Sequence, residues 1–442
     1  MSKKTSSYRL NVFAVVCGVC LAGAVSAGAV EPAEVTLAGD WQVKVTAKTP
    51  SPVTATIEVS RPDIITVTAE KYDKVPNVDP TRNNWRKGIA LAGLKAAECT
   101  VKGAMDTASL VIRDGEGDAA VTFEKGRDYD ADLDWGAIAR LPNGRIKADQ
   151  PVFISYKYAQ MRIDSVVLSS DKKIVLKKGE PNTSMPQVPA LDKGETRLAN
   201  IFISGPLAKL TPDNLFVILE TAYPEPAKPV PSIAEARLPK TMKKLKSGEP
   251  LKILAWGDSV TTFKLWQTMF VERLQAKFPN AKIELVTEAW GGRNTDTYLA
   301  EPPGSIHNYK EKVLAQKPDL IAMEFVNDGG KSQARVEELY SKLLADFQAI
   351  GAEWVILSPH YIRPDMMKLT SQKDIDDDPR DYVKGLRLFC EKHNVALADA
   401  SLRYGRLWRQ GIPYLTLMDN NINHPNVFGH SLFADSLIAL FP

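Results

Sequence analysis

The sequence predicts two regions of different fold class: an all-β region over residues 30–222 and an α/β domain with a parallel sheet over residues 251–442. Three observations lead to this prediction. Short β-branched segments separated by turn residues fill the first region. Strand and helix patterns alternate in the second. A proline-rich stretch lies between them, and the 442 residues exceed the roughly 100–200 of one ordinary domain.

Residues 1–29 are typical of a cleavable export signal. Three basic residues in the first nine positions precede the apolar run Leu10–Val25, and small residues at 25–29 suit cleavage. The apolar run is shorter and richer in small residues than a membrane span of about 20 residues. We therefore expect a secreted or periplasmic protein with no stable membrane span after cleavage; an uncleaved anchor is the alternative.

The region over residues 30–222 has the pattern of an all-β fold. Turn signals such as Asp114-Gly115-Glu116-Gly117 separate its apolar segments, and strands at this spacing favour sandwich-like domains. The region is long for one sandwich of about 100 residues, so we expect one or two, and two would divide between Asp106 and Asp114. The expected strands are Val35–Val45, Thr54–Val59, Ile64–Ala69, Thr107–Ile112, Ala119–Phe123, Val152–Tyr158, Ile163–Leu168, Lys173–Leu176 and Ala199–Ile203.

Residues 223–250 are predicted to link the two regions. Tyr223–Pro231 contains four prolines, which favour an extended, semi-rigid chain. Four lysines follow between Lys240 and Lys246, and we interpret them as part of a solvated segment between domains.

Beyond residue 250 the hydrophobic pattern alternates between strand and helix periods, which predicts a parallel sheet covered by helices on both faces. Such sheets bind ligands beyond the carboxyl ends of their strands, so the residues that follow each strand are of most interest. The expected strands are Leu251–Ala255, Lys282–Val286, Leu320–Val326, Trp354–Leu357 and Ala396–Ala398. The expected helices are Phe263–Phe278, Val336–Ile350, Tyr382–His393 and Leu432–Phe441.

Charge and composition argue against several classes of protein. The 56 basic and 53 acidic residues give a net charge of +3, which gives no reason to expect a nucleic-acid partner. Only two cysteines follow the signal, and the five histidines are scattered without metal-ligand spacing. We therefore expect neither a metal nor another cofactor, while the oligomeric state stays open.

Four positions at strand ends or in a late loop carry groups suited to acyl transfer. Ser259 follows the first strand of the α/β domain, on a turn where helix N-terminal amides can stabilise an oxyanion. Gly292 follows the second strand and lets the backbone present an amide, and Asn327 follows the third and offers a carboxamide donor. His424 precedes the last helix and is the usual kind of general base for a serine hydroxyl. Each signal alone is more typical of an ordinary turn or surface residue, but all four fall on one edge of the predicted sheet.

This combination resembles the SGNH hydrolase superfamily, also called GDSL esterases, which is named for Ser, Gly, Asn and His in four sequence blocks. The run Gly257-Asp258-Ser259-Val260 corresponds to the first block. The resemblance covers residues 251–442 only and implies a flavodoxin-like three-layer αβα sandwich for that domain.

The resemblance also implies a role for each of the four positions. Ser259 corresponds to the nucleophile and His424 to the base. The oxyanion hole would be formed by the Ser259 amide, the Gly292 amide and the Asn327 carboxamide, with Gly291 as a neighbouring alternative to Gly292.

Two positions depart from the family pattern. Phe325 stands two residues before the asparagine, where the family usually has glycine, and this narrows the expected pocket. Asn421 stands three residues before the base, where the family usually has aspartate, and the nearest preceding acid is Asp419. An asparagine can hold the imidazole tautomer but cannot stabilise an imidazolium as a carboxylate does. Three alternatives follow: Asp419 reaches the ring, a Ser-His dyad works with a backbone carbonyl, or activity is impaired.

The sequence therefore predicts an exported carboxylic-ester hydrolase of the SGNH type, with a Ser-His dyad or triad, that removes acetyl or other short acyl esters from carbohydrate. Accessory β-domains are frequent among carbohydrate esterases of the superfamily. The alternatives are a lipid or lysophospholipid esterase and a non-catalytic carbohydrate-binding protein on a degenerate hydrolase scaffold. The expected partner is an esterified carbohydrate or another small ester. Candidates for a sugar-facing cleft are Trp256, Trp266, Trp290, Tyr361 and Arg293.

Overall fold

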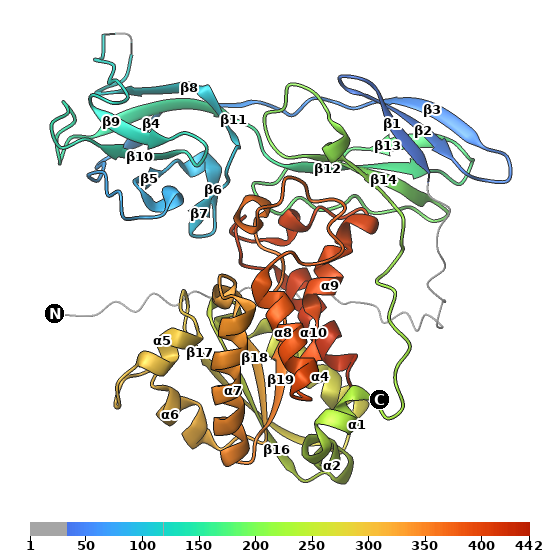
Figure 1. Ribbon diagram of the computed structural model, residues 1–442. Coiled ribbons are helices and arrows are strands. Elements are labelled where there is room, and N and C mark those ends of the chain that lie inside the picture. The colour runs from blue at the N-terminus through green and yellow to red at the C-terminus, as the bar shows by residue number, and fades with distance from the viewer. Residues whose placement is uncertain (1–32, 118) are drawn as a thin grey trace.

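The computed structural model describes residues 33–117 and 119–442, so the predicted export signal lies outside the described residues. Figure 1 shows an α/β domain with the β-rich region placed over one end of its sheet. No helix within these ranges is long and apolar enough to span a bilayer.

The α/β domain is built on five parallel strands in the order β17-β16-β18-β19-β20. In chain order this is second, first, third, fourth and fifth, which is the order of a flavodoxin-like sheet. The predicted α/β class with a parallel sheet is confirmed. The strands are β16 (Pro250–Gly257), β17 (Lys282–Ala289), β18 (Leu320–Glu324), β19 (Glu353–Leu357) and β20 (Ala396–Ala398).

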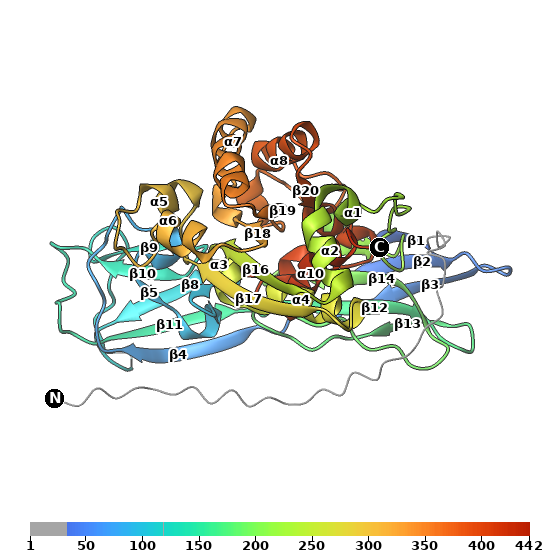
Figure 2. The same ribbon diagram turned by 90° about the horizontal axis from the view of Figure 1, so that it is seen from below.

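Helices cover both faces of this sheet (Figure 2). Alternate residues of a strand point to opposite faces, so Ile253 enters the core beneath α4 and α10, and Leu254 enters the core beneath α7 and α8. The covering helices are α4 (Leu265–Lys277), α10 (Val427–Ile438), α7 (Gln333–Ala349) and α8 (Asp381–Lys392). Short helices lie in the connections: α3 (Ser259–Thr262), α5 (Thr295–Ala300), α6 (Tyr309–Lys312) and α9 (Ala400–Gly405).

Two helices lie inside the segment that was expected to be a linker. They are α1 (Ile233–Arg237), which begins at a capping box formed by Ser232 and Glu235, and α2 (Pro239–Ser247). Met242 and Leu245 of α2 are buried in the same core as β16. The solvated lysines are therefore the outer face of an amphipathic helix that belongs to the α/β domain.

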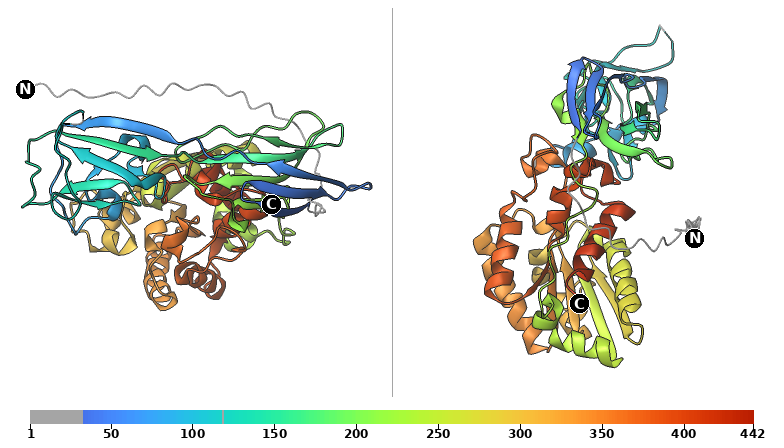
Figure 3. Two further views of the ribbon diagram at one scale, coloured as in Figure 1. Left: turned by 90° about the horizontal axis from the view of Figure 1, so that it is seen from above. Right: turned by 90° about the vertical axis from the view of Figure 1, so that its right-hand side faces the viewer.

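The β-rich region consists of mostly antiparallel strands, as predicted, but its two lobes are divided differently from the expectation (Figure 3). One lobe packs two sheets from both ends of the region, and Trp41 and Val43 share a core with Val166 and Ile201. Its strands are β1 (Glu34–Gly39), β2 (Gln42–Ala47), β3 (Val53–Glu58), β12 (Arg162–Leu168), β13 (Ile174–Lys177), β14 (Thr196–Ile203) and β15 (Leu215–Val217).

The second lobe is inserted into the first, between β3 and β12. The boundary expected between Asp106 and Asp114 is wrong, because β8 runs across it and pairs with β11 at both of its ends. The strands of this lobe are β4 (Ile65–Tyr72), β5 (Ile89–Ala90), β6 (Lys95–Ala96), β7 (Cys99–Thr100), β8 (Met105–Arg113), β9 (Tyr129–Asp132), β10 (Ala137–Arg140) and β11 (Val152–Tyr158).

The inserted lobe packs against the α/β domain. Cys99, Trp135 and Ala137 of the lobe form a small apolar cluster with Ile422, two residues before His424. An ion pair joins Lys102 Nζ to Asp365 Oδ2 at 2.6 Å across the same interface. The β-rich region therefore lies against the loop on which the sequence places the catalytic base.

Candidate active site

Ser259 is the first residue of α3 and directly follows β16 through Asp258. Asp258 caps this short helix, since one of its carboxylate oxygens accepts the Val260 amide at 3.1 Å. The other oxygen accepts the Asn327 amide at 2.8 Å. Asp258 is fully buried, and burial raises its pKa above the usual range. One side chain therefore fixes the serine turn and the asparagine turn relative to each other.

The structure brings Ser259 and His424 together. The Nε2 atom of His424 lies 3.1 Å from the Ser259 Oγ, within hydrogen-bond reach. A general base must stand within about 2.6–3.2 Å of the proton that it removes. The pair therefore has the geometry of a nucleophile and its base.

Amide donors without protein acceptors surround the serine. The Asn327 Nδ2 is buried and has no hydrogen-bond partner among the described residues. The Ser259 amide lies in the first turn of α3, so it has no acceptor inside that helix. Gly292 has φ +72°, a conformation that favours glycine, and the position of a Cβ on Gly291 would lie 3.7 Å from the Ser259 Cβ. Buried donors that lack a partner suit an oxyanion that forms only during reaction.

Phe325, which replaces the usual glycine of the family, does not enter the site. Its side chain is fully buried and packs edge-on against Trp256, with ring centroids 5.0 Å apart. The substitution therefore fills the core beneath α7 and leaves the Asn327 turn in place.

The loop that carries His424 is held together by Asn420. The Asn420 Oδ1 accepts the backbone amides of Ile422, Asn423 and His424 at 3.0, 2.9 and 3.0 Å. Its Nδ2 donates to Glu98 Oε1 at 2.9 Å. Asn420 therefore shapes the loop and also joins it to the β-rich region.

Glu98 is the acidic residue that faces the base. Its Oε1 lies 3.0 Å from the His424 Nδ1, a contact with the length of an ion pair but without the alignment of a straight hydrogen bond. The close approach of the His424 imidazole is the main cause that lowers the pKa of the Glu98 carboxyl, to about 2. Catalytic hydrogen bonds are often poorly aligned in structures without substrate, so the geometry is compatible with a base and its orienting acid.

Asp419 is not the residue that contacts the imidazole, which corrects the expectation from the sequence. Its backbone amide donates to the His424 carbonyl at 2.7 Å, and its carbonyl accepts the Ser184 hydroxyl at 3.0 Å. Asn421 also serves elsewhere: its Oδ1 accepts a hydrogen bond from Arg363 Nη1 at 2.6 Å. The physical reason is that Asn420 folds the loop into a turn whose backbone, rather than its acid, faces the histidine.

Glu98 lies 322 positions before Asn420, the residue that holds the His424 loop together. No local sequence motif could therefore have connected Glu98 with the base. The one signal in the sequence was negative, namely the lack of an acid three residues before His424.

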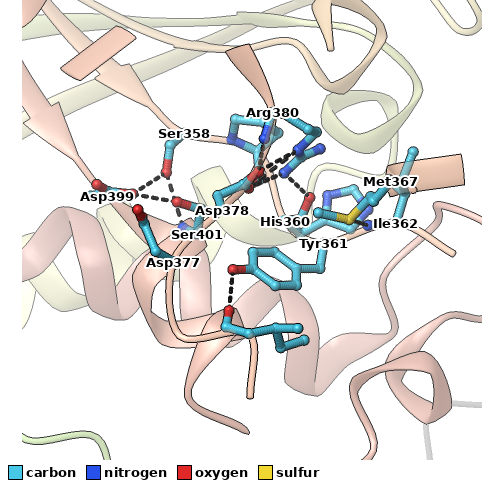
Figure 4. Close-up of polar contacts among 12 residues, drawn as sticks. Ser358, His360, Tyr361, Ile362, Met367, Asp377, Asp378, Arg380, Asp399 and Ser401 are labelled. Atoms are coloured by element: carbon cyan, nitrogen blue, oxygen red, sulfur yellow. Dashed lines mark hydrogen bonds and ion pairs between the residues drawn. The ribbon is translucent and has the colours of Figure 1, made fainter. Parts of the chain in front are cut away.

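A second contact holds the loop from the side of the α/β domain. His360, at the end of β19, donates from Nε2 to the Asn423 carbonyl at 2.8 Å. Burial lowers the pKa of His360 far below its usual range, so the ring is neutral and carries its proton on Nε2. Figure 4 shows Arg380 against both Asp378 and the His360 backbone, with Arg380 Nη2 2.6 Å from the Asp378 carboxylate and 2.8 Å from the His360 carbonyl. The base therefore sits on a loop fixed from two directions.

The aromatic residues expected to line a sugar-facing cleft divide into two groups. Trp256, Trp266 and Tyr361 are fully buried in the cores of the α/β domain. Trp290 is only partly buried; the guanidinium of the exposed Arg293 lies 5.1 Å over its ring. Only this second pair lies where a ligand can reach it, directly beside Gly291 and Gly292 in the chain.

A cleft of about 620 Å³ opens beside Asn327. Ile362 and Met366 supply apolar lining, and Lys331 and Lys368 supply charged groups. A separate cavity of about 380 Å³ lies beneath the proline-rich segment, and its lining includes none of Ser259, Gly292, Asn327 and His424. Across the described ranges, no group of three histidine, cysteine or acidic side chains is arranged to hold a metal ion.

Residues 255–432 match the model of the GDSL-like Lipase/Acylhydrolase family. Among curated proteins, none matches the sequence. One similar solved structure is described as a GDSL-like lipase from Parabacteroides merdae; it is 16% identical over 43% of this chain and 94% of that chain, with a TM-score of 0.32. A Bacillus subtilis protein is 14% identical over 63% of this chain and 76% of its own, with a TM-score of 0.35. A GDSL-like lipase from Bacteroides thetaiotaomicron is 12% identical over 44% and 86%, with a TM-score of 0.28. TM-scores this low do not establish a shared fold. The fold assignment is therefore based on the sheet and helices described above.

Proposed function

We propose that this protein, whose residues 255–432 match the model of the GDSL-like Lipase/Acylhydrolase family, is an exported serine esterase that removes acetyl or other short acyl groups from carbohydrate. The observation that carries the proposal is the 3.1 Å contact between His424 Nε2 and Ser259 Oγ. Export is proposed from the basic and apolar pattern of residues 1–29, and fractionation of cells that produce the full chain tests it.

In the proposed reaction, His424 takes the hydroxyl proton as Ser259 Oγ attacks the ester carbonyl. The amides of Ser259 and Gly292 and the Asn327 carboxamide hold the oxyanion of the tetrahedral intermediate. The C–O bond to the alcohol then breaks, and the alcohol leaves with the proton from His424. Water attacks the acyl-enzyme with the same base, releasing the acid and restoring Ser259.

The surroundings of the site support a polar alcohol. The cleft beside Asn327 contains charged and polar groups, including Lys331, Ser332 and Lys368. The exposed guanidinium of Arg293, which lies over the Trp290 ring, offers hydrogen-bond donors suited to sugar hydroxyls.

A lipid esterase is the second candidate, and one observation favours it. Phe263 is 43% exposed with its ring 5.3 Å from the His424 ring, and Val427 and Phe428 are 61% and 47% exposed at the start of α10. These side chains form an apolar margin near the base. A series of p-nitrophenyl esters separates the two candidates: highest kcat/KM for acetate supports the first, and a steady rise toward long acyl chains supports the second.

The replacement Ser259→Ala tests the nucleophile. We expect loss of p-nitrophenyl acetate hydrolysis and of fluorophosphonate labelling, because no other side chain replaces the attacking oxygen. Ser247→Ala, on the exposed end of α2, is the matched control and should retain both. Undiminished hydrolysis by Ser259→Ala, or folded wild-type protein that takes up no label, would refute the proposed function.

A further inference from the structure

The carboxylate that faces the base comes from the β-rich region, outside the domain that matches the family. We infer that Glu98 is the positioning residue for His424, so that the inserted β-lobe supplies a working part of the hydrolase site. The inference rests on the proposed ester hydrolysis and adds to it a role for the accessory region.

Glu98 sits at the tip of a tight hairpin whose position is well fixed. Ala96 pairs with Cys99 on either side of the two-residue turn, and Ala97 adopts the left-handed conformation with φ +48°. Cys99 and Thr100 behind the turn are buried, and the Thr100 hydroxyl is bonded to the Trp135 carbonyl. The hairpin projects from the lobe toward the α/β domain (Figure 1). A short, anchored turn of this kind holds a side chain in one place at low conformational cost.

Ionisable groups face His424 from four elements. Glu98 faces it from the hairpin, Asp258 from the β16–α3 turn, His360 from the end of β19 and His430 from α10. Burial lowers the pKa of both histidines, to about 4 for His430, and raises that of Asp258. Of the two carboxyl groups, only that of Glu98 has a lowered pKa. Glu98 is therefore the group that stays charged throughout the pH range in which a histidine base works.

Docking of the lobe does not depend on Glu98 alone. The Lys102–Asp365 ion pair and the apolar cluster of Trp135 and Ile422 span the same interface. Glu98 is 40% exposed and adds a contact to the ring and one to Asn420. The interface can thus remain closed in a variant that lacks only the Glu98 charge.

The experiment compares the full-length wild type with Glu98→Gln, Glu98→Asp and the interface control Lys102→Gln. The kcat and KM for p-nitrophenyl acetate are measured from pH 4 to 9, and the titration of the His424 ring protons is followed by NMR. Thermal unfolding confirms that each variant is folded.

We expect Glu98→Gln to lower kcat by about 10²–10⁴-fold with little change in KM, because the imidazolium that forms on proton transfer loses its counter-charge. The acidic limb of kcat/KM and the NMR midpoint of His424 should both move to lower pH. Glu98→Asp, which keeps the charge, should recover part of kcat. Lys102→Gln should retain the wild-type kcat and the wild-type limb.

Other outcomes overturn the inference in distinct ways. A Glu98→Gln enzyme with wild-type kcat and an unmoved limb, alongside an inactive Ser259→Ala enzyme, would refute the role of Glu98 and keep the proposed function. Equal loss in Glu98→Gln and Lys102→Gln with unmoved limbs would reduce Glu98 to a docking contact. A wild type that hydrolyses no ester, combined with a shifted His424 midpoint in Glu98→Gln, would refute the function and retain the pairing.

Discussion

Asn327 holds a buried amide that has no acceptor in the described structure, and this is costly unless something else accepts it. Its backbone is tied to Asp258, so the side chain has a defined origin beside the nucleophile. The unpartnered donor is what favours the proposed oxyanion site over an ordinary turn.

The replacement Asn327→Ala should lower kcat by about 10²–10³-fold, the usual effect of removing one oxyanion donor. KM should change little, because the bond strengthens only as charge develops on the carbonyl oxygen. Steady-state kinetics with p-nitrophenyl acetate measures both constants. A rise in KM at constant kcat would instead show that Asn327 binds the ground state, and Asn77→Ala, at an exposed position of the β-rich region, is the control.

At the scale of elements, the ends of β16 and β18 are joined by the two oxygens of Asp258. Each oxygen accepts one backbone amide, from Val260 and from Asn327. A carboxamide of the same size has only one acceptor oxygen, so it cannot serve both turns. The relative position of Ser259 and Asn327, the proposed nucleophile and oxyanion donor, depends on this shared side chain.

We therefore expect Asp258→Asn to lower kcat by about 10²-fold, since a misplacement of about 1 Å has effects of that size. The orphaned amide should also lower the free energy of unfolding by about 1–3 kcal/mol. Kinetics and urea unfolding measure the two effects. Asp73→Asn, at a side chain that is 82% exposed, is the control and should change neither; an unchanged kcat in Asp258→Asn would show that the turns are fixed independently.

The elements that the sequence predicts best are those whose own periodicity is strong. The five strands and the helices α4, α7 and α8 lie within a few residues of their expected bounds, because short continuous apolar runs mark the buried strands and apolar residues at helical spacing mark the helices. The last helix begins at Val427 rather than Leu432, since the Asn426 side chain caps it by accepting the Gly429 amide at 3.0 Å. The helix α2 was not predicted, because lysines dominate its sequence and only three of its side chains are buried.

The same distinction holds for the site. Ser259, Gly292 and Asn327 follow strands of one sheet, so the fold class alone predicts that they meet at one edge. Glu98 belongs to a separate lobe, and its approach to His424 depends on how two surfaces pack. Nothing within a local window of sequence encodes that packing, so the acid of the site could not be predicted.

At the scale of the whole molecule, stability should depend on pH through buried histidines. His430 is fully buried with neither ring nitrogen partnered, and burial lowers its pKa to about 4. Exposed histidine titrates near 6.5. As the pH falls, the unfolded chain takes up a proton before the folded one does, so the free energy of unfolding decreases between about pH 6.5 and pH 4.

The contribution of His430 to this loss is roughly 3 kcal/mol, at about 1.4 kcal/mol per pKa unit. His430→Phe should remove it while keeping an aromatic ring beside Phe263 and Phe433. Urea unfolding at pH 7, 5.5 and 4 measures the effect, and the difference between variant and wild type should grow steadily as the pH falls. His360 contributes with the same sign, so part of the slope should persist. Parallel curves for variant and wild type would contradict the assignment.

The long separation between Asn420 and Glu98 also has a consequence for biosynthesis. During translation the β6–β7 hairpin is synthesised first, then Ser259, and much later the loop that carries His424. Contacts between such distant segments form late, since a very long loop must close before they can. The complete set of Ser259, His424 and Glu98 therefore does not exist in a nascent chain. Ester hydrolysis should therefore appear only when synthesis and docking of the lobe are finished.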